Sequence, residues 1–221
     1  MIISQTPLRI SFVGGGTDIS DYYREQSGAV LSTSIDKYIY VIIKARFDDK
    51  IVLNYSQKEI VSKVEDVKHE LIREALKMTG IKNGIEITTL ADIPSEGTGL
   101  GSSSSVTIGL LNAMYAYQGR QIDADILANE ACKIEIEICR KPIGKQDQYI
   151  AAYGGLKEIR FYPDETVEVL NINLTKQERL ILGSNLLLFY TGITRKSSSI
   201  LFKQKKETQN KKNILTKMRD Q

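Results

Sequence analysis

Residues 94–105 combine glycine and serine in a pattern that suits phosphate binding. The segment reads PSEGTGLGSSSS and runs directly into VTIGLLNAMYAY, an apolar stretch with helical spacing. Glycine lets the backbone approach an anion closely, and the N–H groups and dipole of a helix N-terminus attract negative charge. Serine hydroxyls add hydrogen-bond donors, and one of them could also bind a metal ion. We therefore predict a loop that surrounds the phosphates of a nucleotide; a serine-capped helix start with a flexible lead-in is the alternative.

Three common nucleotide-binding motifs do not fit this segment. A Walker A loop requires a Gly-Lys-Ser/Thr sequence, and the segment contains no lysine. A dinucleotide fingerprint requires a third glycine at the position that Ser104 occupies. A protein-kinase glycine loop is accompanied by His-Arg-Asp and Asp-Phe-Gly motifs, and this sequence has neither.

The segment instead resembles the second motif of the GHMP kinases, a family that includes galactokinase, homoserine kinase, mevalonate kinase and phosphomevalonate kinase. In that family the loop wraps the phosphates of ATP at the start of a helix. The resemblance implies that ATP is the cofactor. It also implies that the ATP-binding residues are Pro94, Gly97, Gly99, Leu100, Gly101, Ser102, Ser103, Ser104 and Ser105.

Residues 6–18, TPLRISFVGGGTD, resemble the first motif of the same family, in the form found in its heptose and fucose kinases. The resemblance places Arg9 near the transferred phosphate and the acceptor, as a catalytic residue. It also implies a sugar site formed by Gly14, Gly15, Gly16, Thr17 and Asp18. A tight turn in which Asp18 caps the next helix is the alternative.

The segment 134–149, IEIEICRKPIGKQDQY, carries further candidates. If it begins as a helix, Glu135 flanks the apolar stripe of that helix and Glu137 lies on the opposite side. Comparison with the family then pairs Glu135 with Ser103 as the ligands of Mg²⁺. The alternation of isoleucine and glutamate fits equally well a strand in which both glutamates are exposed.

Asp147 matches the catalytic aspartate of the galactokinase-like and mevalonate-kinase-like members. An Asp carboxylate with an ordinary pKa of about 3.9 is a weak base at neutral pH. We therefore expect orientation and electrostatics, with help from Arg9, to contribute more than full proton abstraction. Gln148 is implied as a neighbouring substrate contact. A helix N-cap beside Gly144 is the alternative role for Asp147.

The segment 186–199, LLLFYTGITRKSSS, resembles a strand and polar loop that lie near the sugar phosphate in heptose kinases. Thr194 and Arg195, together with Lys196, are therefore predicted to bind a phosphate already present on the substrate. A solvated basic turn is the alternative.

The elements that must position these residues can be predicted from composition and periodicity. Strands are expected at 4–13, 28–47, 50–55, 84–93, 156–162, 166–174 and 185–192. Helices are expected at 18–25, 65–79, 101–118, 123–140, from 145 onward and at 197–220. This order contains few simple βαβ repeats and favours an α+β fold.

The resemblance covers nearly the whole sequence and implies two domains. Residues 1–180 would form a GHMP kinase N-terminal domain with a fold like ribosomal protein S5 domain 2. Residues 181–221 would begin an incomplete ferredoxin-like C-terminal domain. The third family motif, a glycine-rich loop of that domain, has no counterpart before Gln221, so a C-terminally truncated kinase is expected. Uncovered hydrophobic surface would then favour a homo-oligomer.

Bulk composition argues against several other classes. The 30 Lys and Arg against 27 Asp and Glu give a net charge of +3, which favours neither nucleic acid nor an anionic membrane as partner. No apolar run approaches the roughly 20 residues of a membrane span, and no signal peptide is evident. Cys132 and Cys139 are expected to be reduced thiols on one helix, so a cytoplasmic protein is predicted. The one histidine, His69, is expected on the surface.

The four motifs together predict an ATP-dependent sugar kinase. They most resemble the branch of the family that phosphorylates the anomeric C1 hydroxyl of D-glycero-D-manno-heptose 7-phosphate and forms the 1,7-bisphosphate. A kinase of another sugar, such as fucose or galactose, is one alternative. A fragment that binds Mg-ATP without catalysis is another, since the third motif is missing.

Overall fold

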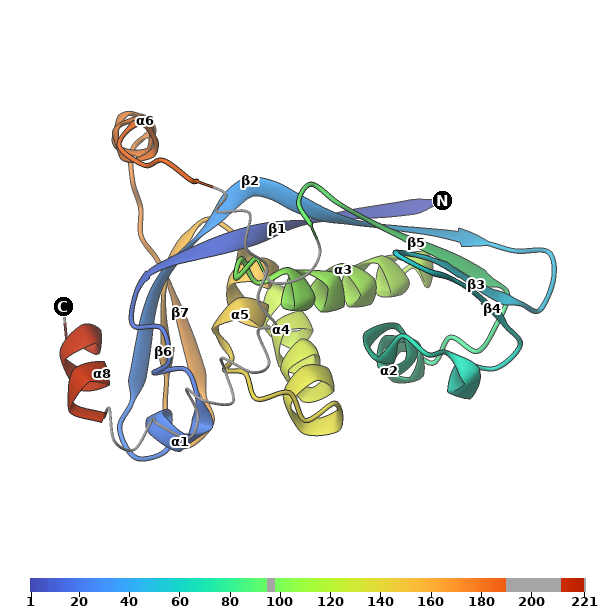
Figure 1. Cartoon of the computed structure of the whole chain (residues 1–221), viewed down its shortest axis with the longest axis horizontal. Coiled ribbons are helices and arrows are strands. Elements are labelled where there is room, and N and C mark those ends of the chain that lie inside the picture. The colour runs from blue at the N-terminus through green and yellow to red at the C-terminus, as the bar shows by residue number, and fades with distance from the viewer. Residues whose placement is uncertain (95–97, 190–211, 221) are drawn as a thin grey trace.

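A seven-stranded sheet organises the chain in the computed structural model, which describes residues 1–94, 98–189 and 212–220 (Figure 1). The strands are β1 (Ile2–Val13), β2 (Gly28–Ala45), β3 (Ile51–Asn54), β4 (Lys58–Val61), β5 (Ile85–Ala91), β6 (Leu156–Phe161) and β7 (Val167–Asn171). Their order is β4-β3-β5-β2-β6-β7, and β1 also pairs with β2. β3 and β5 are parallel, and the other paired strands are antiparallel.

The long strand β2 connects the two halves of the sheet. Its residues 28–33 pair with β6 and its residues 39–45 pair with β5, so both strands extend one edge of β2. β1 pairs along the other edge, with register shifts at Pro7/Arg9 and Ser11/Val13. Such irregularities change the direction of neighbouring side chains. Leu8 accordingly lies in the core while Arg9 points into the site described below.

Helices cover mainly one face of this sheet. They are α1 (Ser20–Tyr23), α2 (Glu70–Thr79), α3 (Ser102–Tyr117), α4 (Ala124–Cys132), α5 (Gln146–Tyr153), α6 (Lys176–Ser184) and α8 (Lys212–Arg219). A 3₁₀ turn occupies Val64–Asp66, and η2 (Lys133–Ile138) is a π-helix. Figure 1 shows α2, α3, α4 and α5 beneath the sheet and α6 on its other side. None of the described helices is both long enough and apolar enough to span a membrane.

Helix α3 packs very closely on β1 and β2 because Gly109 carries no side chain. A Cβ at Gly109 would lie 2.9 Å from Thr6 Oγ1 and 3.3 Å from Ser4 Oγ. Ser4 Oγ donates a hydrogen bond to the Gly109 carbonyl at 2.8 Å. These contacts hold the middle of α3 against β1, and both elements carry residues of the candidate site.

Most of the predicted strands and helices are confirmed, including the β6–β7 hairpin. The predicted helix 65–79, however, begins only at Glu70, because His69 is its N-cap and accepts a hydrogen bond from the Ile72 N–H. His69 is half-buried, and its ring packs edge-on against Tyr55. The prediction of a surface histidine is therefore wrong.

The predicted strand 185–192 is wrong for the part that the structure describes. Residues 185–189 have no regular secondary structure, and Leu187 and Phe189 are exposed. The apolar composition of this segment led to the prediction of a buried strand. The unpredicted helix α6 precedes it, with a capping box formed by Thr175 and Glu178. Residues 190–192 lie outside the described residues, as does most of the predicted helix 197–220, of which 212–219 is helical.

Candidate active site

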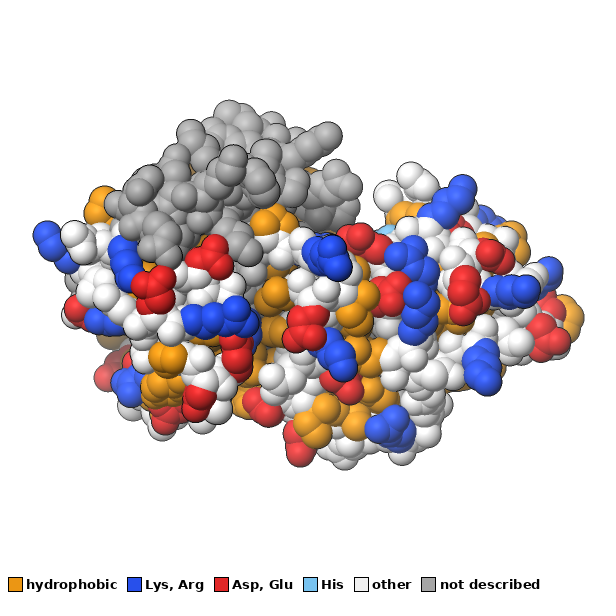
Figure 2. All heavy atoms as spheres, turned by 90° about the horizontal axis from the view of Figure 1, so that it is seen from below, with side chains coloured by type: hydrophobic (Ala, Val, Ile, Leu, Met, Phe, Trp, Pro, Cys, Tyr) orange, Lys and Arg blue, Asp and Glu red, His pale blue; other side chains and the backbone are white. Residues whose placement is uncertain are grey.

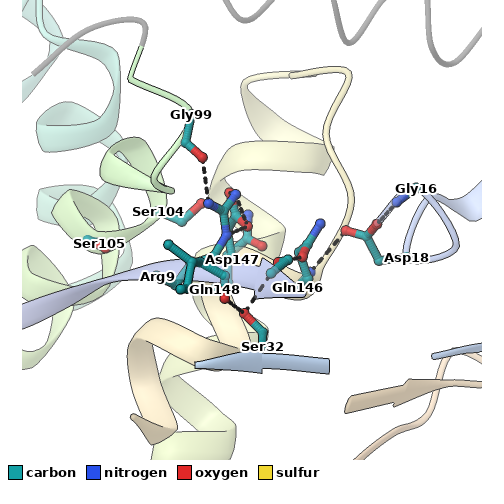
Figure 3. Close-up of polar contacts among 12 residues, drawn as sticks. Arg9, Gly16, Asp18, Ser32, Gly99, Ser104, Ser105, Gln146, Asp147 and Gln148 are labelled. Carbon is teal, nitrogen blue, oxygen red and sulfur yellow. Dashed lines mark hydrogen bonds and ion pairs between the residues drawn. The ribbon is translucent and has the colours of Figure 1, made fainter. Parts of the chain in front are cut away.

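Arg9 and Asp147 form a two-point ion pair at the centre of the candidate site (Figure 3). Arg9 Nε donates to Asp147 Oδ1 at 2.7 Å, and Arg9 Nη2 donates to Asp147 Oδ2 at 2.8 Å. Arg9 comes from β1, and Asp147 lies in the first turn of α5, 138 residues later. Their side chains are 13% and 23% exposed, so the pair is shielded but still accessible. The alternative role of Asp147 as N-cap is wrong, since Lys145 is the N-cap residue of α5.

The glycine-serine loop ends against this ion pair. Arg9 Nη1 donates to the Gly99 carbonyl at 2.6 Å, and the Arg9 backbone N–H donates to the Leu100 carbonyl at 3.1 Å. Gly101 is the N-cap of α3 with a left-handed φ of 76°, and a Cβ there would lie 3.2 Å from Arg9 Cγ. Both conditions favour glycine at this position. The loop thus brings the N-terminus of α3 next to Arg9 and Asp147.

The serines that follow the loop have separate partners. Ser103 Oγ donates to Glu135 Oε1 at 2.5 Å, and Ser104 Oγ donates to Glu135 Oε2 at 2.7 Å. Ser105 Oγ donates to the Pro7 carbonyl at 2.8 Å and attaches α3 to β1. Ser103 is exposed, whereas Ser104 and Ser105 are buried. Ser103 is therefore the hydroxyl among these three that a ligand can reach directly.

Glu135 is fully buried in the π-helix η2. Its carboxylate accepts hydrogen bonds from Ser103, Ser104 and the Gln148 side-chain amide, the last at 2.7 Å. Glu137 is exposed, so the helical prediction is confirmed and the alternative of a strand with two exposed glutamates is wrong. The π-helix itself was not predicted; such segments occur frequently at functional sites.

Gln148 contacts Glu135 rather than an open surface. Its side chain is fully buried, and its amide nitrogen donates to Glu135 Oε2. Its amide oxygen has no hydrogen-bond partner among the described residues. A buried acceptor without a donor is costly, so this oxygen is suited to a donor from a bound ligand or water.

The turn 14–17 packs tightly against β2. A Cβ at Gly14 would lie 1.9 Å from the Ala29 carbonyl oxygen, and Gly14 has a φ of 86°. Thr17 is buried; its hydroxyl donates to the Gly14 carbonyl and accepts from the Ala29 N–H. Gly16 is buried as well, whereas Gly15 is partly exposed. In this structure the turn is held by contacts within the protein, and its role in sugar binding stays a prediction.

Asp18 joins this turn to the start of α5. Its Oδ1 accepts from the Gly16 N–H at 3.0 Å, and its Oδ2 accepts from the Gln146 N–H at 3.2 Å. Burial raises the pKa of Asp18, and the Asp147 carboxylate raises it further, while the two backbone donors oppose the shift. Ile19, not Asp18, is the N-cap of α1, so the alternative of an Asp18 cap is wrong. Figure 3 shows these contacts running from Gly16 through Asp18 to Gln146.

Three residues near the site were missed by sequence reasoning. Ser11 Oγ donates to Gln146 Oε1 at 2.6 Å, which links β1 to α5 beside Asp147. A Cβ at Gly144 would lie only 2.0 Å from Asp18 Oδ2. Lys141 Nζ donates to Ser103 Oγ at 3.0 Å. For Lys141 and Gly144 the signal was their position on the connection between Glu135 and Asp147, since two predicted site residues fix both ends of it. For Ser11 it was the position two residues after Arg9 on β1.

Some predicted contacts lie outside the described residues, namely Gly97, Thr194, Arg195 and Lys196. Pro94 is exposed at the end of the described part of its loop, and Ser102 is the first residue of α3. A cavity of about 760 Å³ lies between the sheet and α6, lined among others by Ile10, Leu156 and Leu182. Neither Arg9 nor Asp147 is among the described residues that line it.

Ser103 and Glu135 are suitable ligands for Mg²⁺. Hydroxyl and carboxylate oxygens are hard donors, and Mg²⁺ usually combines one or two protein ligands with waters and substrate phosphates. The described residues contain no cluster of three or more His, Cys, Asp or Glu that could hold a metal without such help. The donor set therefore fits a metal that arrives with the phosphates of a nucleotide.

Charged side chains of both signs are mixed on the helix-covered face of the molecule. Figure 2 shows Lys and Arg side chains next to Asp and Glu side chains there, with apolar side chains between them. Such a mixed surface provides no broad field of one sign for steering a polyanion.

Comparison with known proteins identifies relatives among sugar kinases. Residues 62–155 match the family described as "GHMP kinases N terminal domain". D-glycero-alpha-D-manno-heptose 7-phosphate kinase of Campylobacter jejuni is 31% identical over 211 residues, which cover 90% of this chain and 62% of that protein. Galactokinase of Pyrococcus furiosus is 27% identical, over 93% of this chain and 57% of that protein. The chain thus spans about three fifths of the length of these curated relatives.

A solved structure resembles the whole described fold. The crystal structure of a D-glycero-D-manno-heptose 1-phosphate kinase from Bacteroides thetaiotaomicron superposes with a TM-score of 0.81 at 25% identity. The match covers 98% of this chain and 74% of that chain.

Proposed function

We propose, from the match of residues 62–155 to the GHMP kinase N-terminal domain, that the protein is a kinase of this family and transfers the γ-phosphate of ATP to a hydroxyl group of a sugar. The observation that carries this proposal is the placement of the Arg9–Asp147 pair against Gly99 and Gly101, where the glycine-serine loop becomes α3. A helix N-terminus with a glycine loop suits the phosphates, and a carboxylate with an arginine suits the acceptor hydroxyl.

In this mechanism Asp147 holds the acceptor hydroxyl and accepts its proton. A carboxylate can accept about four hydrogen bonds, so Asp147 can bind a hydroxyl without losing the two bonds from Arg9. Arg9 keeps the Asp147 carboxylate oriented. Its positive charge also stabilises the negative charge of the phosphoryl group in the transition state. Phosphoryl transfer depends mainly on such positioning and charge stabilisation.

Ser103 and Glu135 would hold Mg²⁺, which supplies positive charge beside the phosphates when it is bound. Ser104 and Gln148 keep the buried Glu135 carboxylate in one orientation. These neutral donors satisfy part of the carboxylate and leave Glu135 Oε1 directed toward the exposed Ser103 hydroxyl.

The proposed acceptor is the anomeric C1 hydroxyl of D-glycero-D-manno-heptose 7-phosphate. The names of two relatives, both heptose phosphate kinases, support it. We place the sugar beside Gly15, Asp18 and Gln146, close to Asp147. We also propose that residues 1–180 form the N-terminal domain and that 181–221 begin a second domain.

A coupled ADP-release assay on the 221-residue chain tests the proposal. It uses Mg-ATP with the heptose 7-phosphate, the unphosphorylated heptose, fucose and galactose in parallel. We expect turnover with the heptose phosphate and a decrease in kcat of about 10²–10⁴-fold for Asp147→Asn. Asp164→Asn, in the exposed β6–β7 turn, is the matched control and should keep full activity.

The pattern of outcomes separates the alternatives. Turnover confined to fucose or galactose would replace the proposed substrate but keep the sugar kinase. Saturable Mg-ATP binding without turnover of any sugar would contradict the proposal and indicate a chain that binds nucleotide without catalysis.

A further inference from the structure

We propose that Lys141 is the resident cation of the Ser103–Glu135 pair: its ammonium group holds the two oxygens in the metal-free protein and leaves them when a divalent cation binds. This inference rests on the proposed function, because it takes Ser103 and Glu135 as the metal ligands. It assigns to Lys141 a role in controlling the affinity of that site.

The Lys141 ammonium contacts both oxygens of the proposed site. Lys141 Nζ donates to Ser103 Oγ at 3.0 Å and lies 3.6 Å from Glu135 Oε1. Ser103 Oγ in turn donates to the same Glu135 Oε1 at 2.5 Å. The three groups therefore form a compact triangle, in which the Lys141 ammonium contacts the exposed Ser103 hydroxyl and the buried Glu135 carboxylate.

Glu135 needs a positive charge nearby because it is fully buried. An ionised carboxylate is costly to bury unless it is paired as well as hydrogen-bonded. Ser103, Ser104 and Gln148 supply hydrogen bonds but no charge. Lys141 supplies the charge in the metal-free protein, and a divalent cation would supply it in the loaded protein.

The backbone places Lys141 at this point. After η2 ends, Arg140 adopts a left-handed conformation with a φ of 51°, which is uncommon for a residue with a side chain. The reversal lets the Lys141 N–H donate to the Glu135 carbonyl at 2.9 Å. Both the backbone and the side chain of Lys141 therefore bind the Glu135 and Ser103 region, so its proximity does not depend on a flexible side chain alone.

A second carboxylate gives the ammonium group another position. Glu70 Oε1 lies 3.4 Å from Lys141 Nζ, and the Glu70 side chain is 50% exposed. When a divalent cation takes Ser103 and Glu135, the repelled ammonium can keep Glu70 and point toward solvent or toward the phosphates of a nucleotide. Lys141 therefore acts as a competitor for the empty site without blocking the loaded one.

Binding of Mn²⁺ without nucleotide, measured by electron paramagnetic resonance, tests this inference. Lys141→Met should bind Mn²⁺ at least about fivefold more tightly than the wild type, because the competing and repelling charge is gone. Glu135→Gln in the Lys141→Met background should abolish the gain, which assigns the metal to this site. Lys141→Arg keeps the charge and should resemble the wild type.

Lys77→Met is the matched control. Lys77 Nζ also pairs with a mostly buried glutamate, Glu74, at 3.0 Å, but Glu74 lies on α2 and has partners of its own. Lys77→Met should therefore leave the Mn²⁺ affinity unchanged. If Lys141→Met does not fold, Lys141→Gln keeps a donor for Ser103 and should show the same gain in affinity.

Thermal unfolding provides a second readout. The metal-free Lys141→Met protein should melt below the wild type, because Glu135 loses its cation, and Mg²⁺ should raise its midpoint more than that of the wild type. Unchanged or weaker Mn²⁺ binding in Lys141→Met would overturn the inference. Failure of the kinase proposal is detected separately, since these measurements use neither ATP nor sugar.

Discussion

Breaking the Arg9–Asp147 pair should cost far more free energy of unfolding than breaking an exposed pair of the same length. The two hydrogen bonds of 2.7 and 2.8 Å join side chains that are 13% and 23% exposed. Arg160 and Glu158 offer the comparison, because Arg160 Nε lies 2.6 Å from Glu158 Oε1 but the side chains are 45% and 35% exposed. The contact distances match, so burial and two-point geometry are the main differences.

The expected coupling energy follows from these two features. An exposed pair contributes about 0.2–1 kcal/mol in double-mutant cycles. Hydrogen bonds to charged groups contribute about 1.5–3 kcal/mol, and loss of one partner of a fully buried pair costs about 3–5 kcal/mol. Arg9 and Asp147 lie between these limits, so we expect a coupling of about 2–3 kcal/mol, against less than about 0.5 kcal/mol for Arg160 and Glu158.

Urea unfolding of the wild type, Arg9→Gln, Asp147→Asn and the double variant measures this coupling. Far-ultraviolet circular dichroism is the appropriate signal, since the chain has no tryptophan. The same cycle on Arg160→Gln and Glu158→Gln provides the control. A coupling for Arg9 and Asp147 no larger than that of the control pair would refute the reasoning, because the pair would then behave as an exposed salt bridge.

Three further outcomes follow from individual contacts. Gly144→Ala should lower the free energy of unfolding in urea by about 2–4 kcal/mol, since the added Cβ would lie 2.0 Å from Asp18 Oδ2. Gly183→Ala is the control, because a Cβ added there would meet no neighbouring atom within 4 Å. Burial raises the pKa of Glu165, but hydrogen bonds from its neighbours outweigh it and lower the pKa to about 2. The ionised Glu165 therefore stabilises the folded protein fully above its ordinary pKa of 4.5, and this contribution is lost as the pH falls toward 2. The free energies of unfolding of the wild type and Glu165→Gln should differ by about 1 kcal/mol at pH 7 and converge near pH 2. Ser105→Ala removes the 2.8 Å hydrogen bond from α3 to the Pro7 carbonyl of β1 and should lower the free energy of unfolding in urea by about 1–2 kcal/mol.

Local patterns in the sequence predicted the helix that carries Glu135 because periodicity reports which face of a helix is apolar. They could not predict that this helix becomes a π-helix at 133–138, since nothing in the residues KIEIEI distinguishes the two windings. The role of Asp18 was also hidden. Its partner, the Gln146 N–H, is 128 residues away, and only the folded chain shows that the two segments meet.

Hydrophobicity gave a wrong answer at residues 185–189 for a related reason. An apolar run predicts a preference for burial but does not say which element covers it. The run LLLF was therefore predicted to be a core strand, whereas the structure exposes Leu187 and Phe189. The periodicity around Glu135 reports which of its faces is apolar, whereas the composition of residues 185–189 does not report whether a partner element is present to bury them.

The separation of 138 residues between Arg9 and Asp147 also affects how the protein is made. A ribosome adds about 5–20 residues per second, so β1 leaves it roughly 7–28 s before α5. During that time β1 can pair with β2, but Arg9 lacks its anion and the glycine-serine loop lacks the helix that completes the site. Closing a loop of this length carries an entropy cost that must be met by many contacts forming together. The ion pair should therefore form late in folding, and its appearance would report that β1, α3 and α5 have docked as one unit.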